Sequence, residues 1–316
     1  MKKGKVSDTI LGRSVYKLLG KRGTNKVSRP AYGQDAAHID CNGENVLVTA
    51  ASGLWPVYRA ANNISAAGGR IVTITDTVLI DEKSREIRLK EIISELDRQC
   101  MNVNIPVASG HTAVSPDVVK PVVSVTGIGL TTRTASKAKP GQDIVMTKCI
   151  GISGIRYIAD KKKGEILKVF SEDVVNKAVG NELDMLVYPE ADIFMQQGTA
   201  GAMHDVSEGG IFAALWDMAE YSGVGLDIDF RAIPVRQEII EICELLNINP
   251  YILDSMGCLL MTCENGCDIV NVMQENGIRA AVIGKVTAGN DRIIHNVEED
   301  RYLGLPEQDE IYRFID

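Results

Sequence analysis

The sequence predicts an α+β fold with two domains. The chain has 316 residues, of which 45% are apolar and 24% charged, so it is long enough and apolar enough to form two soluble cores. Segments typical of strands and of helices follow one another in a similar broad order in both halves. A small polar stretch with a Pro-Gly pair, Thr134–Gln142, separates the halves, as linkers between domains do. We therefore expect one α+β domain over residues 1–137 and another over residues 138–316.

The first half is expected to begin with a helix and to continue as strands and helices. A rough apolar face favours a helix over Asp8–Arg22, with Asp8 as its N-cap. Two strands, Asp35–Asp40 and Val46–Ala50, flank Asn42-Gly43, a residue pair typical of a two-residue hairpin turn. The other segments expected in this half are the helices Pro56–Ala67, with proline in its first turn, and Ser84–Met101, and the strands Arg70–Ile80, Ile105–Ala108 and Val119–Leu130.

The second half starts again with a strand, Asp143–Thr147. Helical patterns fill residues 153–198, a strand ends at His204, and the periodicity of Glu208–Tyr221 predicts a strong helix. Short strands are expected at Leu226–Ile228, Gly257–Thr262, Ala280–Ile283 and Arg292–Ile294, with helices between them. This order fits two sheets in separate domains better than one doubly wound sheet.

Composition and charge exclude several classes of protein. The formal net charge of −8 argues against a nucleic-acid-binding protein. No apolar run approaches the roughly 18 residues that span a bilayer, and the charged start lacks the apolar run of a signal peptide, so we expect a cytoplasmic protein without membrane association. The seven cysteines are an odd number, which indicates free thiols.

One region runs against the overall charge. Residues 1–30 contain nine Lys or Arg and a single acid, Asp8. Such a segment is typical either of a solvated basic arm or of a lid over anionic phosphates.

The segment 203–210, MHDVSEGG, has the strongest signal for chemistry. A strand ends in His-Asp, Ser207 can cap the next helix, and two glycines open its first turn. Glycine destabilises a helix, but a helix start with bare backbone N–H groups is a natural anion site. The alternative is that Gly209 and Gly210 only allow close packing of the helix against a strand, and the pattern leaves both interpretations open.

Two further side chains have a functional and a structural interpretation. His111, in a glycine-containing loop, is either an active-site acid, base or metal ligand or a hydrogen-bonded structural histidine. Lys148 follows a buried strand and precedes glycines, so it either contacts phosphate or faces solvent.

Taken together, these segments resemble the superfamily that includes aminoimidazole-ribonucleotide (AIR) synthase and the HypE-type hydrogenase-maturation factors. HDVSEGGIFAALWDMAEYSGVGLDID resembles the signature of the family's second domain, and GQDAAHID resembles the acidic strand entry of its first domain. AANNISAAGG, VMTKCIGISG and DSMGCLLMTC fall, in the right order, where the family has similar runs. SGHTAVSPDVVKPVVSVTGIG is most similar to the HypE-like branch.

The resemblance implies a fold and a chemistry. The first domain would hold a mixed sheet that pairs with its twin into a dimer barrel, and the second would be an α+β layer domain. Members use ATP to activate an amide or acid oxygen or to transfer a phosphoryl group, with nucleotide and Mg²⁺ in the cleft between the domains. We therefore expect a homodimer that binds ATP or a small phosphate ligand and, in the HypE-like branch, a maturation partner protein.

The residue pattern and the resemblance together assign site residues. Catalytic roles fall to His111 and Asp205, and Asp35 is the expected metal ligand. The expected cofactor-binding residues are Asp35, Asn63, Gly110, Lys148, Ser207, Glu208, Gly209 and Gly210.

Departures from the family pattern weaken the expected metal site. Where the family has acids, this chain has Ala50-Ala51-Ser52, Asn62-Asn63 and Gly110-His111. Mg²⁺ requires oxygen ligands, mostly carboxylates and water, so Asp35 alone predicts weak or altered use of Mg²⁺. The sequence also ends in DEIYRFID, without the cysteine-bearing tail of the HypE factor, so its carrier chemistry is not expected by the usual route.

Two functions stay open at this point. One is an ATP-dependent synthase, dehydratase or phosphotransferase with altered metal use. The other is a catalytically degenerate paralogue that acts as a dimeric binding or regulatory protein.

Overall fold

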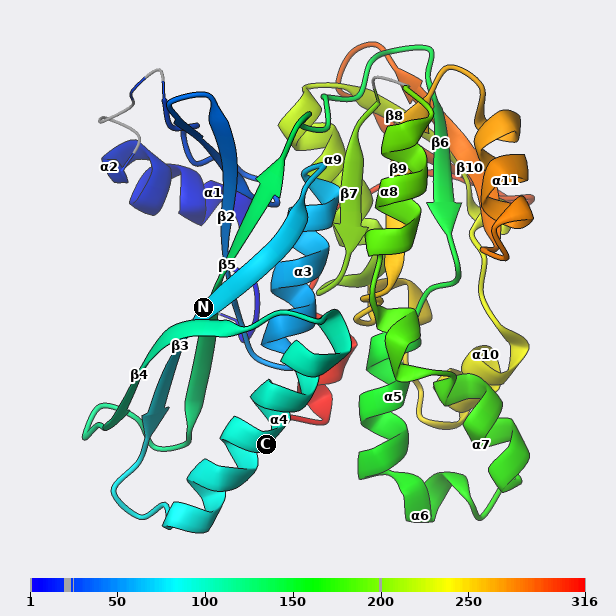
Figure 1. Ribbon diagram of the computed structural model, residues 1–316. Coiled ribbons are helices and arrows are strands. Elements are labelled where there is room, and N and C mark those ends of the chain that lie inside the picture. The colour runs from blue at the N-terminus through cyan, green and yellow to red at the C-terminus, as the bar shows by residue number, and fades with distance from the viewer. Residues whose placement is uncertain (1, 20–23, 25, 199–200, 316) are drawn as a thin grey trace. The chain divides into compact units, whose positions relative to one another are not determined.

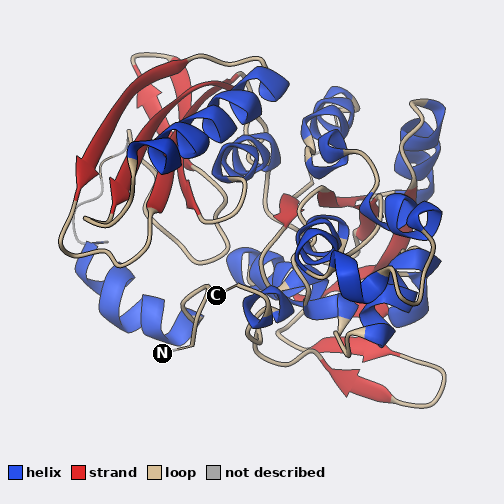
Figure 2. Ribbon diagram, turned by 90° about the horizontal axis from the view of Figure 1, so that it is seen from below, coloured by secondary structure: helices blue, strands red, loops and turns tan. Residues whose placement is uncertain are grey.

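Two compact units make up the structure, a computed structural model that describes residues 2–19, 24, 26–198 and 201–315. The N-terminal unit comprises Gly23–Arg29 and Asp35–Thr134. The C-terminal unit comprises Met1–Arg22, Pro30–Gln34 and Ala135–Asp316. Each unit contains its own β-sheet and helices (Figures 1 and 2), which confirms the expected α+β fold with two sheets.

A five-stranded mixed sheet forms the centre of the N-terminal unit. In order across the sheet its strands are β1 (Ala37–Cys41), β2 (Glu44–Ser52), β5 (Val122–Thr131), β3 (Arg70–Ile80) and β4 (Val107–Val114). Neighbouring strands are antiparallel except for the parallel pair β3 and β4. Asn42 and Gly43 join β1 to β2 with φ angles of 59° and 97°, the left-handed pair that the predicted two-residue hairpin turn requires.

Helix α3 (Pro56–Ala66) packs on one face of this sheet, and helix α4 (Glu86–Val103) packs beside α3 (Figure 2). Pro56 stands at the start of α3, where its fixed φ suits a helix and its missing N–H is not needed. Tyr58 and Ile64 of α3 and Ile74 of β3 are fully buried. Burial of such side chains stabilises the layer by roughly 25 cal/mol for each Å² of apolar surface.

Strand β4 is longer than the sequence predicts. The expected strand ends at Ala108 and leaves Gly110 and His111 in a loop, but both residues lie within β4, opposite Asp76 and Thr77 of β3. The loop assignment is therefore wrong. Parallel pairing with β3 supplies the backbone hydrogen bonds of a segment whose small, polar residues have little strand preference of their own.

A seven-stranded mixed sheet forms the centre of the C-terminal unit. In order across the sheet its strands are β12 (Asp300–Tyr302), β11 (Arg292–His295), β8 (Gly225–Asp229), β10 (Ala280–Thr287), β6 (Asp143–Thr147), β9 (Cys258–Cys263) and β7 (Met203–Val206). The pair β8 and β11 is parallel, and the other neighbouring pairs are antiparallel. Every residue of β9 is buried, as its continuous apolar sequence requires.

The helices that follow β6 in the chain are α5 (Ile152–Lys161), α6 (Lys163–Ile166), α7 (Glu172–Val179), α8 (Tyr188–Gln196), α9 (Gly210–Ser222), α10 (Gln237–Leu245) and α11 (Gly266–Glu275), with short 3₁₀ turns at Glu182–Met185, Phe230–Ala232, Pro250–Ile252 and Glu310–Arg313. Helices α8, α9 and α11 lie beside this second sheet, and α5, α6, α7 and α10 form a group below it in the view of Figure 1. Glycines in the left-handed region flank α9, Gly209 with φ 85° and Gly223 with φ 72°. No helix among the described residues is long and apolar enough to cross a bilayer.

The N-terminal segment of the chain belongs to the C-terminal unit. It runs as α1 (Asp8–Leu11), a π-helical stretch (Gly12–Tyr16) and α2 (Lys17–Leu19), and residues 20–22 of the expected helix lie outside the described residues. Ser7, with extended backbone, is the N-cap, and Asp8 is the first helical residue, so the assignment of Asp8 as N-cap is wrong. An acid in the first turn still stabilises the helix through its dipole.

Candidate functional site

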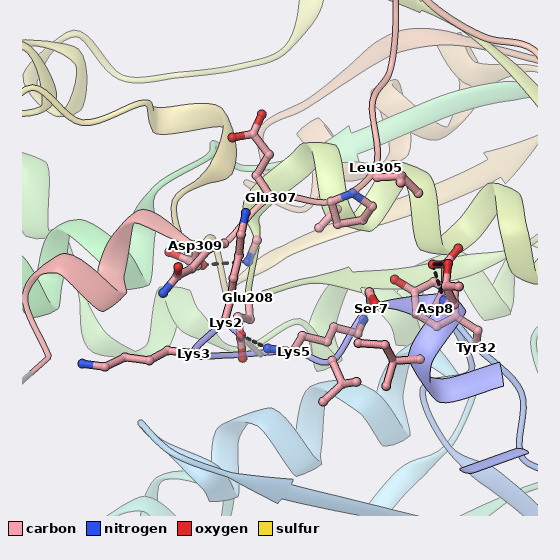
Figure 3. A pocket seen from close by; sticks show the side chains of 17 residues that line it. Lys2, Lys3, Lys5, Ser7, Asp8, Tyr32, Glu208, Leu305, Glu307 and Asp309 are labelled. Carbon is pink, nitrogen blue, oxygen red and sulfur yellow. Dashed lines mark hydrogen bonds between the residues drawn. The ribbon is translucent and has the colours of Figure 1, made fainter. Parts of the chain in front are cut away.

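A pocket of 450 Å³ lies at the start of helix α9 (Figure 3). Three segments of the C-terminal unit and Tyr32 line it: N-terminal residues 2–10, the start of α9, and C-terminal residues 305–309. Its charged side chains are those of Lys2, Lys3, Lys5, Asp8, Glu208, Glu307 and Asp309. The pocket therefore adjoins the segment 203–210 to which the sequence pattern points.

The first turn of α9 differs from the expectation in its cap. Gly209, not Ser207, is the N-cap residue. Ser207 lies two residues earlier, and its carbonyl oxygen accepts hydrogen bonds from Gly210 N (3.0 Å) and Ser255 N (3.3 Å). A Cβ at Gly210 would stand 2.5 Å from the carbonyl oxygen of Tyr251. Close packing therefore requires glycine at position 210, which agrees with the structural interpretation of the two glycines.

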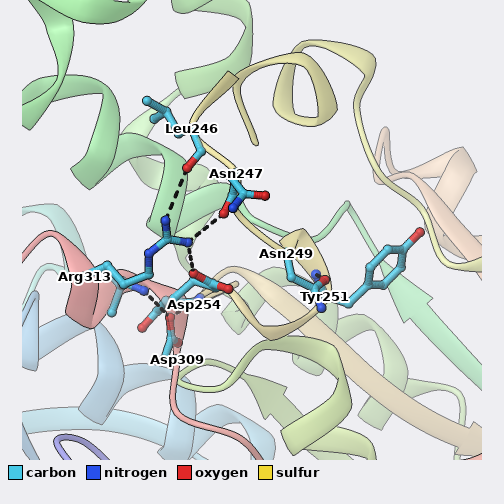
Figure 4. Close-up of polar contacts among 9 residues, drawn as sticks. Leu246, Asn247, Asn249, Tyr251, Asp254, Asp309 and Arg313 are labelled. Carbon is cyan, nitrogen blue, oxygen red and sulfur yellow. Dashed lines mark hydrogen bonds and ion pairs between the residues drawn. The ribbon is translucent and has the colours of Figure 1, made fainter. Parts of the chain in front are cut away.

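The carboxylate of Asp309 occupies the position that the helix start offers to an anion. Its Oδ2 accepts a hydrogen bond from Gly209 N at 2.7 Å. Its Oδ1 accepts from Ile311 N at 2.8 Å and from Asp254 N at 3.2 Å, and Figure 4 shows Asp309 beside Asp254. Bare N–H groups at a helix start attract negative charge, and here the chain supplies that charge itself. A phosphate at Gly209 would have to displace Asp309.

A second buried carboxylate lies next to Asp309. Asp254 is 1% exposed, and its Oδ1 accepts hydrogen bonds from Ser153 Oγ and, at 3.3 Å, from Met256 N. Burial and the neighbouring charge of Asp254 raise the pKa of Asp309 to about 7, although its three backbone hydrogen bonds oppose the shift. Near neutral pH, the charge at this helix start therefore depends on pH.

A buried ion pair joins the N-terminal segment to α9. Lys5 Nζ donates to Asp217 Oδ2, and His204 Nε2 lies 3.8 Å from the same oxygen. Burial alone would raise the pKa of Asp217, but the hydrogen bond with His204 and the charge of Lys5 lower it to about 2. Burial and then the charge of Asp217 raise the pKa of Tyr32.

Asp217 and Lys5 are not among the residues predicted from the sequence. The available signal for Asp217 is an acid between Trp216 and Met218 on a helix whose side chains are otherwise mostly apolar and buried. The predicted residues nearby are placed as follows: His204 and Asp205 lie on β7 and are buried, and Glu208 lines the pocket.

Lys148 forms an internal ion pair at the end of strand β6. Its Nζ lies 2.6 Å from Glu190 Oε1 and donates to the carbonyl oxygens of Asp184 (3.1 Å) and Leu186 (2.6 Å). Glu190 is completely buried, and a buried carboxylate without a cation would be costly. Lys148 also lines a second cavity, of 1110 Å³. Its phosphate contact stays a prediction.

In the N-terminal unit, Asp35 and Asn63 are connected through Thr49. Asn63 Nδ2 donates to Thr49 Oγ1 at 3.0 Å, and Thr49 Oγ1 donates to the carbonyl oxygen of Asp35 at 2.8 Å. The structure thus brings together two predicted ligand-binding residues, one at a strand entry and one on α3.

Gly110 and His111, on β4, lie beside a further acid of the N-terminal unit. A Cβ at Gly110 would stand 2.6 Å from Asp76 Oδ2, so glycine leaves room for this carboxylate. Burial raises the pKa of Asp76. His111 is exposed.

These residues do not by themselves form a metal site. Within the described parts of the chain, no group of three or more His, Cys, Asp or Glu could hold a metal ion. Mg²⁺ is commonly held by one or two carboxylates plus water and phosphate oxygens. Asp35 is connected to the neutral Asn63 through Thr49, so no chemical step is assigned to Mg²⁺.

Comparison with known proteins places these residues in a family. The model of the AIR synthase related protein, N-terminal domain, matches residues 27–131, and that of the AIR synthase related protein, C-terminal domain, matches residues 139–296. This chain belongs to the AIR synthase related protein family. The two matched domains follow each other as the resemblance implied.

Individual relatives belong to the HypE-like branch of the family. Carbamoyl dehydratase HypE of Rhizobium leguminosarum bv. viciae is 26% identical over 260 residues, which are 78% of this chain and 71% of the relative. The crystal structure of a HypE-HypF complex matches with a TM-score of 0.71 at 21% identity over 86% of this chain and 93% of that chain. Hydrogenase maturation protein HypE in complex with ATP matches with a TM-score of 0.66 at 17% identity over 98% of this chain and 97% of that chain. The expected AIR-synthase-like fold and the HypE-like resemblance are confirmed.

Proposed function

We propose that this protein binds ATP, or another ligand with a phosphate group, and uses it in a maturation or synthase reaction. The observation that supports this most is the match of both AIR synthase related domains, in order, together with relatives that are carbamoyl dehydratases. A HypE structure also contains ATP. We further propose that its dependence on Mg²⁺ is weak or altered.

The residues of both units support an anionic ligand. Lys2 and Lys3 line the pocket at α9 and would attract phosphate. When Asp309 moves away, the N–H of Gly209 would donate a hydrogen bond to phosphate instead. In the N-terminal unit, the connected pair Asp35 and Asn63 offers oxygen and amide groups to a polar ligand.

Catalytic roles are proposed for two of the predicted residues. His111 is exposed on β4, so its ring can reach a ligand and act on it as an acid, a base or a metal ligand. Asp205 is 3% exposed on β7, and a buried carboxyl group suits proton transfer because its surroundings control its charge. The proposed set of binding residues also includes Gly110, Ser207, Glu208 and Lys148.

The solved HypE-HypF complex supports a protein partner as well. We propose that this chain also acts with a maturation partner protein and as a homodimer. Copurification of this chain with the proteins that neighbouring genes encode would test for such a partner.

The decisive experiment is calorimetric titration of the full chain with ATP, with and without Mg²⁺ or Mn²⁺. We expect ATP binding that Mg²⁺ strengthens little. Asn63→Asp should increase the effect of Mg²⁺, because it restores a carboxylate near Asp35, and Ser52→Asp should add to it. Asn42→Asp, in the exposed turn between β1 and β2, makes the same charge change in a turn that accepts Asp-Gly equally well and serves as the control.

Two results would contradict this proposal. If neither the wild type nor Asn63→Asp binds ATP, the protein is not a nucleotide-binding member of its family. If the wild type hydrolyses ATP rapidly with Mg²⁺, the account of altered metal use is wrong, and Asp76 or Asp205 supplies the missing carboxylate. Binding of ATP without hydrolysis, whichever metal is present, would favour the alternative of a catalytically degenerate paralogue.

A further inference from the structure

The N-terminal arm, residues 2–7, is held in place by contacts of Lys3, Gly4 and Lys5. Lys3 Nζ donates to the carbonyl oxygen of Ile315 at 3.4 Å. Lys5 N donates to Glu208 Oε1 at 2.5 Å, and Lys5 Nζ donates to Asp217 Oδ2. The arm therefore touches Glu208, which lines the pocket at the start of α9, and Ile315, which follows the C-terminal wall of the pocket in the chain.

Gly4 fits between the side chains of Glu208 and Tyr312. A Cβ at this position would stand 2.4 Å from Glu208 Oε1 and 2.6 Å from Tyr312 Cε2. The φ angle of Gly4 is 98°, a value that side-chain-bearing residues rarely adopt. The docked arm thus depends on glycine here, both for space and for backbone conformation.

Asp217 makes the docking of the arm energetically favourable. Its side chain is 3% exposed, and its neighbour His204 stands 3.8 Å away. A carboxylate in such surroundings needs a full positive charge close by, because an uncompensated buried charge is strongly destabilising. Lys5, with a side chain 44% exposed, supplies that charge from the arm. Undocking the arm would remove this charge and leave Asp217 with His204 and Tyr32 as partners.

The docked arm also determines the charge of the pocket. Lys2 and Lys3 stand on the same short segment as Lys5 and line the pocket (Figure 3). The opposite C-terminal wall contributes the acids Glu307 and Asp309. Without the arm, the pocket would lose its ammonium groups and keep its carboxyl groups, and an anionic ligand would be repelled.

We propose that Asp217 is a positioning residue that holds the arm closed through Lys5 and thereby sets the affinity of the pocket for a phosphate-bearing ligand. The proposal rests on the proposed function for the identity of the ligand. The docking of the arm does not depend on that identity.

The test combines hydrogen exchange of the arm with ATP titration, on the full chain. Gly4→Ala, Lys5→Met and Asp217→Asn should each speed exchange of the backbone amide of residue 5 and weaken ATP binding about tenfold, a change that corresponds to roughly 1.4 kcal/mol. Gly12→Ala is the matched control, because a Cβ at Gly12 meets no atom within 4 Å; it should leave exchange and affinity at wild-type values. The double variant Lys5→Met with Asp217→Asn should lose little more than either single variant.

Each outcome bears on the proposal. The proposal would be overturned if the backbone amide of residue 5 exchanged at the wild-type rate in Lys5→Met and Asp217→Asn. Fast exchange with unchanged ATP affinity would overturn it as well. If Asp217→Asn does not fold, Gly4→Ala and Lys5→Met, which alter only the arm, decide the question. If the wild type binds no ATP while the arm variants still speed exchange, the proposed function fails, the effect on affinity fails with it, and the docking by Asp217 stands.

Discussion

At the scale of single residues, the start of α9 shows a side chain in the place of a ligand. The residue pattern of segment 203–210 offers bare N–H groups to an anion, and Asp309, about a hundred residues later in the chain, accepts the hydrogen bond of Gly209. Asp309 cannot be recognised as that acceptor from its own neighbours in the sequence, LPEQDEIY, because its surroundings are created by the fold.

The titration of Asp309 gives a prediction for stability against pH. Its pKa in the folded protein is raised to about 7, against an ordinary value of about 4 in an unfolded chain. The folded protein therefore keeps a proton that the unfolded chain releases, and this stabilisation is complete below about pH 4 and lost as the pH rises towards 7. Asn does not titrate. The free energy of unfolding of Asp309→Asn, relative to that of the wild type, should therefore rise by on the order of 2 kcal/mol between pH 5 and pH 8.

Urea unfolding of both proteins at four pH values between 5 and 8 measures the difference. The variant should be less stable than the wild type at pH 5, because an amide nitrogen cannot accept the hydrogen bonds of backbone N–H groups. Glu298→Gln, at an exposed position, is the control for a general change of charge. Parallel curves for Asp309→Asn and the wild type would show that Asp309 does not titrate in this range.

At the scale of elements, most boundaries follow from local chemistry. Strands Arg70–Ile80 and Asp143–Thr147 have the predicted bounds, since their β-branched and apolar residues suit a buried sheet. Helix α3 starts at Pro56. Strands β4 and β10 run past their predicted ends, and in β4 the pairing with β3, not its own composition, extends the strand through Gly110 and His111.

The contact between β6 and α8 gives a second prediction. Lys148→Met would remove the cation from Glu190, which is completely buried, and should destabilise the protein by about 3–5 kcal/mol. The double variant Lys148→Met with Glu190→Gln should recover a large part of that loss, since no buried charge is then left without a partner. Denaturant unfolding measures both effects.

A matched control and a functional readout make this test specific. Lys177→Met breaks the exposed pair of Lys177 and Asp173 and should change the stability far less than Lys148→Met, because solvent screens an exposed pair. A similar loss in Lys177→Met and Lys148→Met would contradict the role of Glu190. In the folded double variant, ATP titration shows whether Lys148 also contacts phosphate, which would appear as weaker binding.

At the scale of the whole molecule, the sheet of the N-terminal unit predicts self-association. Helix α3 packs on one of its faces, to which Leu47 and Val125 contribute buried side chains. Residues of the other face are partly exposed and include Val122 and Leu130, each 45% exposed, and the half-buried Ile128. An apolar sheet face of this kind favours burial against a second copy.

Sedimentation of Ile128→Lys tests this prediction. The wild type should be a dimer at micromolar concentration, and a buried lysine at the interface should shift Ile128→Lys to the monomer. Val297→Lys is the control, because Val297 is 71% exposed in the C-terminal unit. A monomeric wild type, or a dimer that Ile128→Lys leaves intact, would rule out this interface.

The candidate site was only partly within reach of the sequence. Asp35, Asn63 and the segment 203–210 break the local pattern, and local pattern is what a sequence shows directly. Asp217, Lys5 and Asp309 look ordinary in their own segments. Their roles arise from contacts between residues 212 positions apart, for Lys5 and Asp217, and 100 positions apart, for Gly209 and Asp309.

The sequence by itself determined the two-sheet α+β fold, most element boundaries and the family, because apolar periodicity, turn residues and the order of motifs are properties of the chain. Only the tertiary structure decided which charges meet: it paired Lys148 with Glu190 and Lys5 with Asp217, and it placed Asp309 at the start of α9. The physical reason is desolvation. A buried charge must find a partner, and which partner is available depends on how distant segments pack, which no local pattern records.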